Sequence, residues 1–78
     1  MMSKKLKEEI LLSSEGVTID VKTLNEDIYE EWYIVKKTKR YITIAVTRYK
    51  WDNLEGEWYE IFGYVYDFPI KRFIEEEA

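Results

Sequence analysis

Two stretches of the chain carry apolar residues at helical spacing, and the residues between them follow a different pattern. The two apolar stripes are Leu6, Ile10, Leu11 and Leu12 near the start, and Ile70, Phe73 and Ile74 near the end. Apolar residues three or four positions apart form one face of a helix, which predicts helices over residues 3–13 and 69–77. Gly16 suits the turn that ends the first helix, and Pro69 suits the first turn of the second.

Between these helices, apolar and polar residues alternate, which is the pattern of half-buried β-strands. Strands are expected over residues 17–23, 31–37, 41–51 and 57–66. Residues 24–30 have two interpretations. Thr23 and Glu26 have the spacing of a helix capping box, whereas Ile28 begins a run of strand-forming residues, which favours a turn.

Matching residues across the three turns predicts how the strands pair. The pairs nearest the turns are Thr23 with Ile28, Lys36 with Tyr41 and Trp51 with Glu57. Farther along, this register places Ile19 opposite Trp32, Tyr33 opposite Ile44, Ile44 also opposite Tyr64, and Arg48 opposite Glu60. Facing residues then agree in character in all three hairpins. The predicted fold class is therefore α+β: a single domain with a four-stranded antiparallel β-meander flanked by a short N-terminal helix and a short C-terminal helix, in the order α-β-β-β-β-α.

In this register the sheet has two apolar faces. One face carries Tyr33, Val35, Ile42, Ile44, Val46, Phe62, Tyr64 and Tyr66, and the other carries Val17, Ile19, Val21, Trp32, Ile34, Tyr59, Ile61 and Val65. Two short helices can cover both faces only if each helix takes one. Otherwise a second copy must cover the remaining face, and the dimer face expected in that case consists of Tyr33, Ile44, Phe62, Tyr64 and Tyr66.

Composition removes most catalytic chemistry. The chain has neither cysteine nor histidine, which excludes disulfides, thiol nucleophiles, thiolate zinc sites and imidazole general bases. Carboxylate pairs remain, but they need a cleft that shifts their pKa values, and a sheet of this size has little room for one. We therefore expect no enzymatic activity, no catalytic residues, no cofactor and no bound metal.

The chain also lacks the patterns of membrane and secreted proteins. No apolar run approaches the length of a membrane-spanning helix, and the charged first residues are unlike a secretory signal, so a cytoplasmic protein is expected. Glutamate, lysine, isoleucine and tyrosine are abundant and glutamine is absent, a composition typical of hyperthermophile proteins. Aromatic residues make up 17% of the chain, which supplies a large apolar area for a small core.

Charge becomes informative once it is placed on the meander. The net charge is −4, and the first and third turns lie at one end of the sheet. That end collects the acidic residues Glu26, Asp27, Asp52, Glu55 and Glu57 and the aromatic residues Tyr49, Trp51, Trp58 and Tyr59. The second turn, at the other end, carries Lys36, Lys37, Lys39 and Arg40. The acidic and aromatic end is interpreted as a partner-binding surface, although charged turns also serve simply to keep strand ends soluble.

These features favour binding over catalysis. The first hypothesis is a small non-enzymatic protein-binding module whose partner is a host protein or a second copy. Its size and charge are typical of virus- and plasmid-encoded inhibitors of host machinery, such as anti-CRISPR and anti-restriction proteins. A second hypothesis is a nucleic-acid-binding or transcription-related factor that uses the basic turn at residues 36–40. The net negative charge disfavours it. A third is a structural homo-oligomer.

Overall fold

The computed structural model describes residues 3–74, and its elements follow the predicted order. They are α1 (Lys4–Leu12), β1 (Thr18–Lys22), β2 (Ile28–Lys37), β3 (Tyr41–Asp52), β4 (Glu57–Pro69) and α2 (Lys71–Ile74). The strands form one antiparallel sheet in the order β1-β2-β3-β4, so the predicted fold class is confirmed. Strand β2 begins three residues earlier than expected and β4 ends three residues later. The expected helical residues after Ile74 lie outside the described part of the chain.

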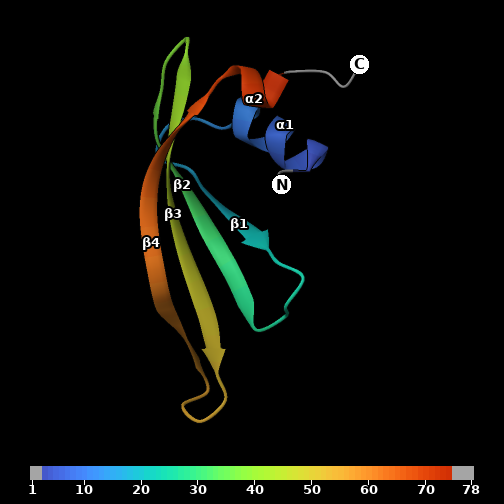
Figure 1. The fold of residues 1–78 in the computed structure, drawn as a ribbon, viewed down its shortest axis with the longest axis vertical. Helices are drawn as coiled ribbons and strands as arrows, with labels where there is room; N and C mark the ends of the chain where they lie inside the picture. Colours follow the sequence, from blue (N-terminus) through green and yellow to red (C-terminus); the bar gives the residue numbers. More distant parts are fainter. Residues whose placement is uncertain (1–2, 75–78) are drawn as a thin grey trace.

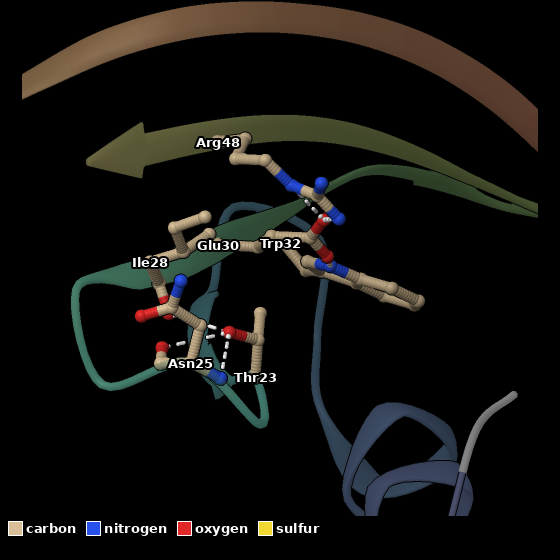
Figure 2. Close-up of polar contacts among 6 residues, drawn as sticks. All are labelled: Thr23, Asn25, Ile28, Glu30, Trp32 and Arg48. Atoms are coloured by element: carbon tan, nitrogen blue, oxygen red, sulfur yellow. Dashed lines mark hydrogen bonds and ion pairs between the residues drawn. The ribbon is translucent and has the colours of Figure 1, made fainter.

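The turn before β2 is held by side-chain hydrogen bonds and is not a helix. The Thr23 hydroxyl lies 2.9 Å from the carbonyl oxygen of Asn25 and 2.8 Å from that of Ile28, and it accepts a bond from the Asn25 N–H. The Asn25 side chain in turn accepts a bond from the Asp27 N–H. Figure 2 shows this turn beside β2. The favoured interpretation as a turn is therefore correct for residues 24–27, whereas residues 28–30 belong to β2.

Both helices pack against the same side of the sheet (Figure 1). The buried residues form a single cluster to which α1 contributes Ile10 and α2 contributes Phe73. The sheet contributes Ile19, Trp32, Ile34, Ile42, Ile44, Val46 and Phe68. We call the side that carries these residues the core face and the opposite side the outer face. Of the arrangements considered from the sequence, the one with both helices on one face is the one observed.

Helix α1 is tied to the sheet through Lys37. The Lys37 ammonium donates to the carbonyl oxygens of Leu11 at 2.8 Å and Ser13 at 2.7 Å, with Ile10 at 3.3 Å. Its backbone N–H donates to a carboxylate oxygen of Glu15 at 2.8 Å. The last carbonyls of a helix have no partner within the helix, and they carry the negative end of its dipole. Lys37 therefore fixes the C-terminal end of α1 onto the end of β2.

We predict that Lys37→Met lowers the free energy of unfolding by about 2 kcal/mol, because three carbonyl groups lose a charged donor. The neighbouring Lys36→Met is the matched control. Lys36 is exposed and faces the outer side, so its replacement should change stability by less than about 0.5 kcal/mol. Urea unfolding followed by circular dichroism measures both variants. Equal effects would contradict the anchoring role of Lys37.

The pairing of β1 with β2 follows the predicted register, with Ile19 opposite Trp32. The predicted pairing of β2 with β3 is wrong by one residue over most of its length, because Ile34, and not Tyr33, lies opposite Ile44. Next to the turn it is wrong by two residues, because Lys36 lies opposite Thr43 and not Tyr41. A β-bulge at Val35 and a turn held by the Thr38 hydroxyl displace the two strands relative to each other. A shift of one residue moves side chains to the other face, so the apolar residues of β1, β2 and β3 gather on the core face.

The predicted pairing of β3 with β4 is wrong by two residues over most of its length. Ile44 lies opposite Tyr66, and Arg48 lies opposite Phe62 and not Glu60. One residue of the difference arises at the turn, where Trp51 faces Trp58, and the other at a bulge beside Arg48. A shift of two residues preserves the faces, so the aromatic residues of β4 stay on the same side of the sheet as Ile44.

These registers divide the expected dimer face. Ile44 is fully buried beneath the helices, and Tyr33 lies on the outer face. Phe62, Tyr64 and Tyr66 share the core face, where each is 44–47% exposed because they lie on the edge strand. The five residues therefore do not form one surface, and a dimer cannot use them together.

Candidate functional site

The helices leave part of the core face open, and this part forms a hollow. It has a volume of about 650 Å³. Trp32 and Glu30 line it from β2, Tyr64 and Phe68 from β4, and Leu6 from α1. The hollow therefore begins where the packed core ends.

Glu30, which lines this hollow, forms a partly buried ion pair with Arg48 (Figure 2). Glu30 is 8% exposed. One of its carboxylate oxygens accepts bonds from Arg48 Nε at 2.9 Å and Nη2 at 2.6 Å, and the other accepts a bond from Trp32 Nε1 at 2.9 Å. The Arg48 guanidinium also lies 5.2 Å from the centre of the Phe62 ring. Both oxygens of Glu30 already have donors, so the group orders the sheet and is not arranged as a general base.

The outer face carries a different feature near the β3–β4 turn. Four aromatic residues from three strands pack together there, and we call them the tip cluster: Tyr29, Tyr49, Trp51 and Trp58. Tyr29 stacks on Tyr49 with ring centres 5.1 Å apart, and it meets Trp58 edge-to-face at 4.7 Å. Trp58 is 40% exposed. The cluster is therefore an ordered aromatic surface outside the core.

Carboxylates surround the tip cluster. Burial raises the pKa of Tyr29, and the nearby carboxylates of Glu31 and Asp20 raise it further. Burial also raises the pKa of Tyr49. The carboxylate of Glu31 raises it further, and that of Glu60 has a weaker effect in the same direction. Both shifts have an electrostatic part of the same sign, because a negative neighbour disfavours a phenolate. The rings therefore have carboxylates nearby, and one cation, Lys22, lies opposite Tyr29.

A second hollow borders the cluster. It has a volume of about 450 Å³ and lies beside Tyr29 and Trp58. Asp20, Glu26 and Lys22 also line it. Aromatic walls and acidic residues thus meet at the end of the sheet that the sequence identifies as acidic.

The structure brings together three of the aromatic residues expected at this end, Tyr49, Trp51 and Trp58. Tyr59 is not part of the cluster, because alternation along β4 turns it to the opposite face. The member missed from the sequence is Tyr29, which lies in the segment interpreted as a turn. The strand-forming residues around Tyr29 could have indicated that it belongs to a strand.

The acidic residues expected at this end are divided between the β1–β2 turn and the β3–β4 turn. Asp52 shapes the β3–β4 turn, where its side chain accepts bonds from the N–H groups of Leu54 and Glu55. Glu26 and Asp27 lie on the β1–β2 turn, whose Asp27 carbonyl accepts a bond from the Trp51 N–H at 2.8 Å. Glu55 and Glu57 are exposed at the β3–β4 turn.

At the other end, the basic turn is only partly available. Lys36, Lys39 and Arg40 are exposed, but the Lys37 ammonium is bound to the end of α1. A phosphate contact at this turn would therefore depend on fewer cations than the sequence suggests.

Among residues 3–74, no helix is long and apolar enough to cross a membrane. Within the same residues, no three acidic side chains are grouped so that they could hold a metal ion. Comparisons with protein-family models, with curated proteins and with solved structures give no match.

Proposed function

We propose that the chain is a non-enzymatic protein-binding module that binds a basic surface of its partner through the tip cluster. The observation that carries the proposal is the position of this cluster. Ordered tyrosine and tryptophan rings lie outside the core, with Asp20, Glu31 and Glu60 around them. Tyrosine and tryptophan dominate the binding energy of protein interfaces, because they supply a large rigid area.

The surrounding charges suggest the chemistry of the partner. A lysine or arginine side chain can lie over an aromatic ring and interact with a carboxylate beside it. The hollow next to Trp58 offers both groups to an incoming side chain. A surface of this kind also suits an inhibitor that occupies the nucleic-acid-binding surface of its target, since such surfaces are basic.

The nucleic-acid hypothesis draws less support from the arrangement. Stacking platforms for single strands combine exposed rings with a basic groove. Here the rings lie among carboxylates, and the basic turn lies at the opposite end of the sheet. The third hypothesis, self-association, concerns a different surface and is compatible with partner binding.

The proposal is tested with a labelled peptide that alternates arginine with serine, and fluorescence anisotropy measures its binding at low salt. We expect Trp58→Ala to weaken binding at least about tenfold, which corresponds to about 1.4 kcal/mol. Tyr41→Ala is the matched control, because Tyr41 is 47% exposed but lies at the other end of β3. We expect this variant to bind as the original chain does.

Two further probes decide between the hypotheses. A peptide with glutamate in place of arginine should not bind. If it binds equally well, or if Trp58→Ala has no effect on the arginine peptide, the proposal fails. Tighter binding of a short single-stranded DNA than of the arginine peptide, lost on Lys39→Ala, would instead favour the nucleic-acid hypothesis.

A further inference from the structure

Strand β4 is an unusually open edge. The strand order leaves β1 and β4 at the two edges of the sheet. Strand β1 has 5 residues, whereas β4 has 13, and every residue of β4 from Glu57 to Asp67 is exposed. A long edge strand offers unpaired backbone groups that can hydrogen-bond with another strand.

The middle of β4 has the composition of a strand that pairs. Residues 61–66 read Ile-Phe-Gly-Tyr-Val-Tyr, with no charge and no proline. Val65 is 65% exposed, and the three aromatic residues are nearly half exposed. Short uncharged segments rich in β-branched and aromatic residues associate readily when they lie on an edge. This stretch is therefore suited to pairing with another strand.

The charge distribution indicates that the strand that pairs with β4 is β4 of a second copy of this chain. The molecule is polarised along β4: the β1–β2 and β3–β4 turns lie toward one end, and the β2–β3 turn and α2 lie toward the other (Figure 1). The first two turns contain the acidic residues Glu26, Asp27 and Glu55, whereas the β2–β3 turn and α2 contain Arg40, Lys71 and Arg72. A hydrogen bond from the Ile70 N–H to the Arg40 carbonyl joins these two basic segments. A strand of 13 residues is roughly 43 Å long, which matches the 44 Å length of the molecule. Antiparallel pairing of two such strands places the acidic end of each molecule beside the basic end of the other.

We propose that two copies of this chain pair antiparallel through β4, with the two-fold axis at Tyr64, to form a continuous eight-stranded sheet. Residues opposite each other in such a pair must lie on the same face. Centring the pair on Tyr64 meets this condition over residues 62–66 and places Phe62 opposite Tyr66 and Tyr64 opposite its own copy. Aromatic residues directly opposite each other stabilise neighbouring strands.

Within residues 62–66 no charged residues face each other, because this stretch carries no charge. Beyond it, the bulge beside Arg48 turns Glu60 to the outer face and Lys71 belongs to α2, so the charges act between the ends of the two molecules and not as paired residues of the strands. Centring on Gly63 instead would pair Phe62 with Tyr64 and leave Tyr66 without an aromatic partner. The pairing proposal does not rest on the proposed binding of a basic partner, because its centre at Tyr64 lies apart from Tyr29, Tyr49, Trp51 and Trp58.

Sedimentation velocity tests the association. The original chain should sediment as a dimer at low salt, and Tyr64→Glu should sediment as a monomer, because two carboxylates would meet at the two-fold axis. Tyr33→Glu is the matched control: Tyr33 is 44% exposed and Tyr64 is 46% exposed, but Tyr33 lies on an inner strand and on the outer face. It should remain a dimer. A monomeric original chain, or equal effects of both substitutions, would overturn the proposal.

Cysteine cross-linking tests the geometry, since the chain contains no cysteine. Across a two-fold axis between antiparallel strands, the Cα atoms of one residue and its copy lie about 4.5–5.5 Å apart, which is within the range of a disulfide. Tyr64→Cys should therefore form a covalent dimer under mild oxidation, and Tyr33→Cys should not. A mixture of Phe62→Cys and Tyr66→Cys should cross-link as a heterodimer. A dimer in which Tyr64→Cys cross-links no faster than Tyr33→Cys would show a different interface.

Discussion

Replacing Ile34 with alanine is expected to lower the free energy of unfolding by about 3 kcal/mol, one of the largest effects of any single substitution in this chain. Ile34 is fully buried and lies opposite Ile44 at the centre of the sheet. Alanine would remove a large apolar side chain and leave a cavity that the rigid strands cannot close. A domain of this size has a total stability on the order of 4–12 kcal/mol. Urea unfolding followed by circular dichroism measures the loss.

The neighbouring substitution Val35→Ala supplies the control. Val35 is 44% exposed and lies at the bulge of β2, so its truncation should cost less than about 1 kcal/mol. In the register predicted from the sequence, Val35 and Ile34 lie on opposite faces that are both apolar. That register would predict a similar decrease in the free energy of unfolding for both substitutions. Comparable losses would therefore contradict the observed pairing of β2 with β3.

The order of the elements could be predicted because it depends on local patterns. Helical spacing around Ile10 and Phe73, and alternation from Val17 onward, identify the elements without knowledge of their packing. The pairing of β1 with β2 could also be predicted, since the turn at residues 24–27 is held by its own side chains. In these regions the interactions that determine the structure lie close together in the sequence.

The remaining registers could not be predicted, because they depend on bulges. A bulge at Val35 and another beside Arg48 each add one residue to one strand of a pair, and no local residue pattern marks either position. Each single shift reverses the direction of the side chains beyond it. The two apolar faces inferred from alternation thus become one core face, and both helices can cover it together.

In the candidate site, too, some features could be predicted from local patterns and others could not. The nearness of Tyr49, Trp51 and Trp58 to the β3–β4 turn could be predicted from the sequence. Their position on one face could not, because the predicted pairing of Trp51 with Glu57 places Trp58 on the opposite face, whereas in the structure Trp51 lies opposite Trp58. The ion pair of Glu30 with Arg48 was missed, because Arg48 was placed opposite Glu60. One signal was present: Glu30 occupies the same alternating face of β2 as Trp32 and Ile34, and an acidic residue in a buried row requires a partner.

That partner makes Arg48→Met the second substitution with a large expected effect, a loss of about 2–3 kcal/mol. Methionine retains most of the apolar length of arginine, but Glu30 would lose both charged donors and keep only Trp32 Nε1. Removing one member of a buried pair leaves a charge that neither water nor protein solvates well. The estimate lies below the usual range for fully buried pairs because the Arg48 side chain is 36% exposed. Chemical denaturation measures the change.

A double-mutant cycle separates the ion pair from the packing of Arg48. If the loss arises from the unpaired carboxylate of Glu30, then Glu30→Gln combined with Arg48→Met should be more stable than Arg48→Met alone, because a neutral amide tolerates burial better. Lys50→Met is the control for removing a cation from β3: Lys50 is exposed and faces the same side two residues further on. Its effect should stay within about 0.5 kcal/mol. Additive losses in the cycle would mean that Arg48 stabilises the sheet through Phe62 alone.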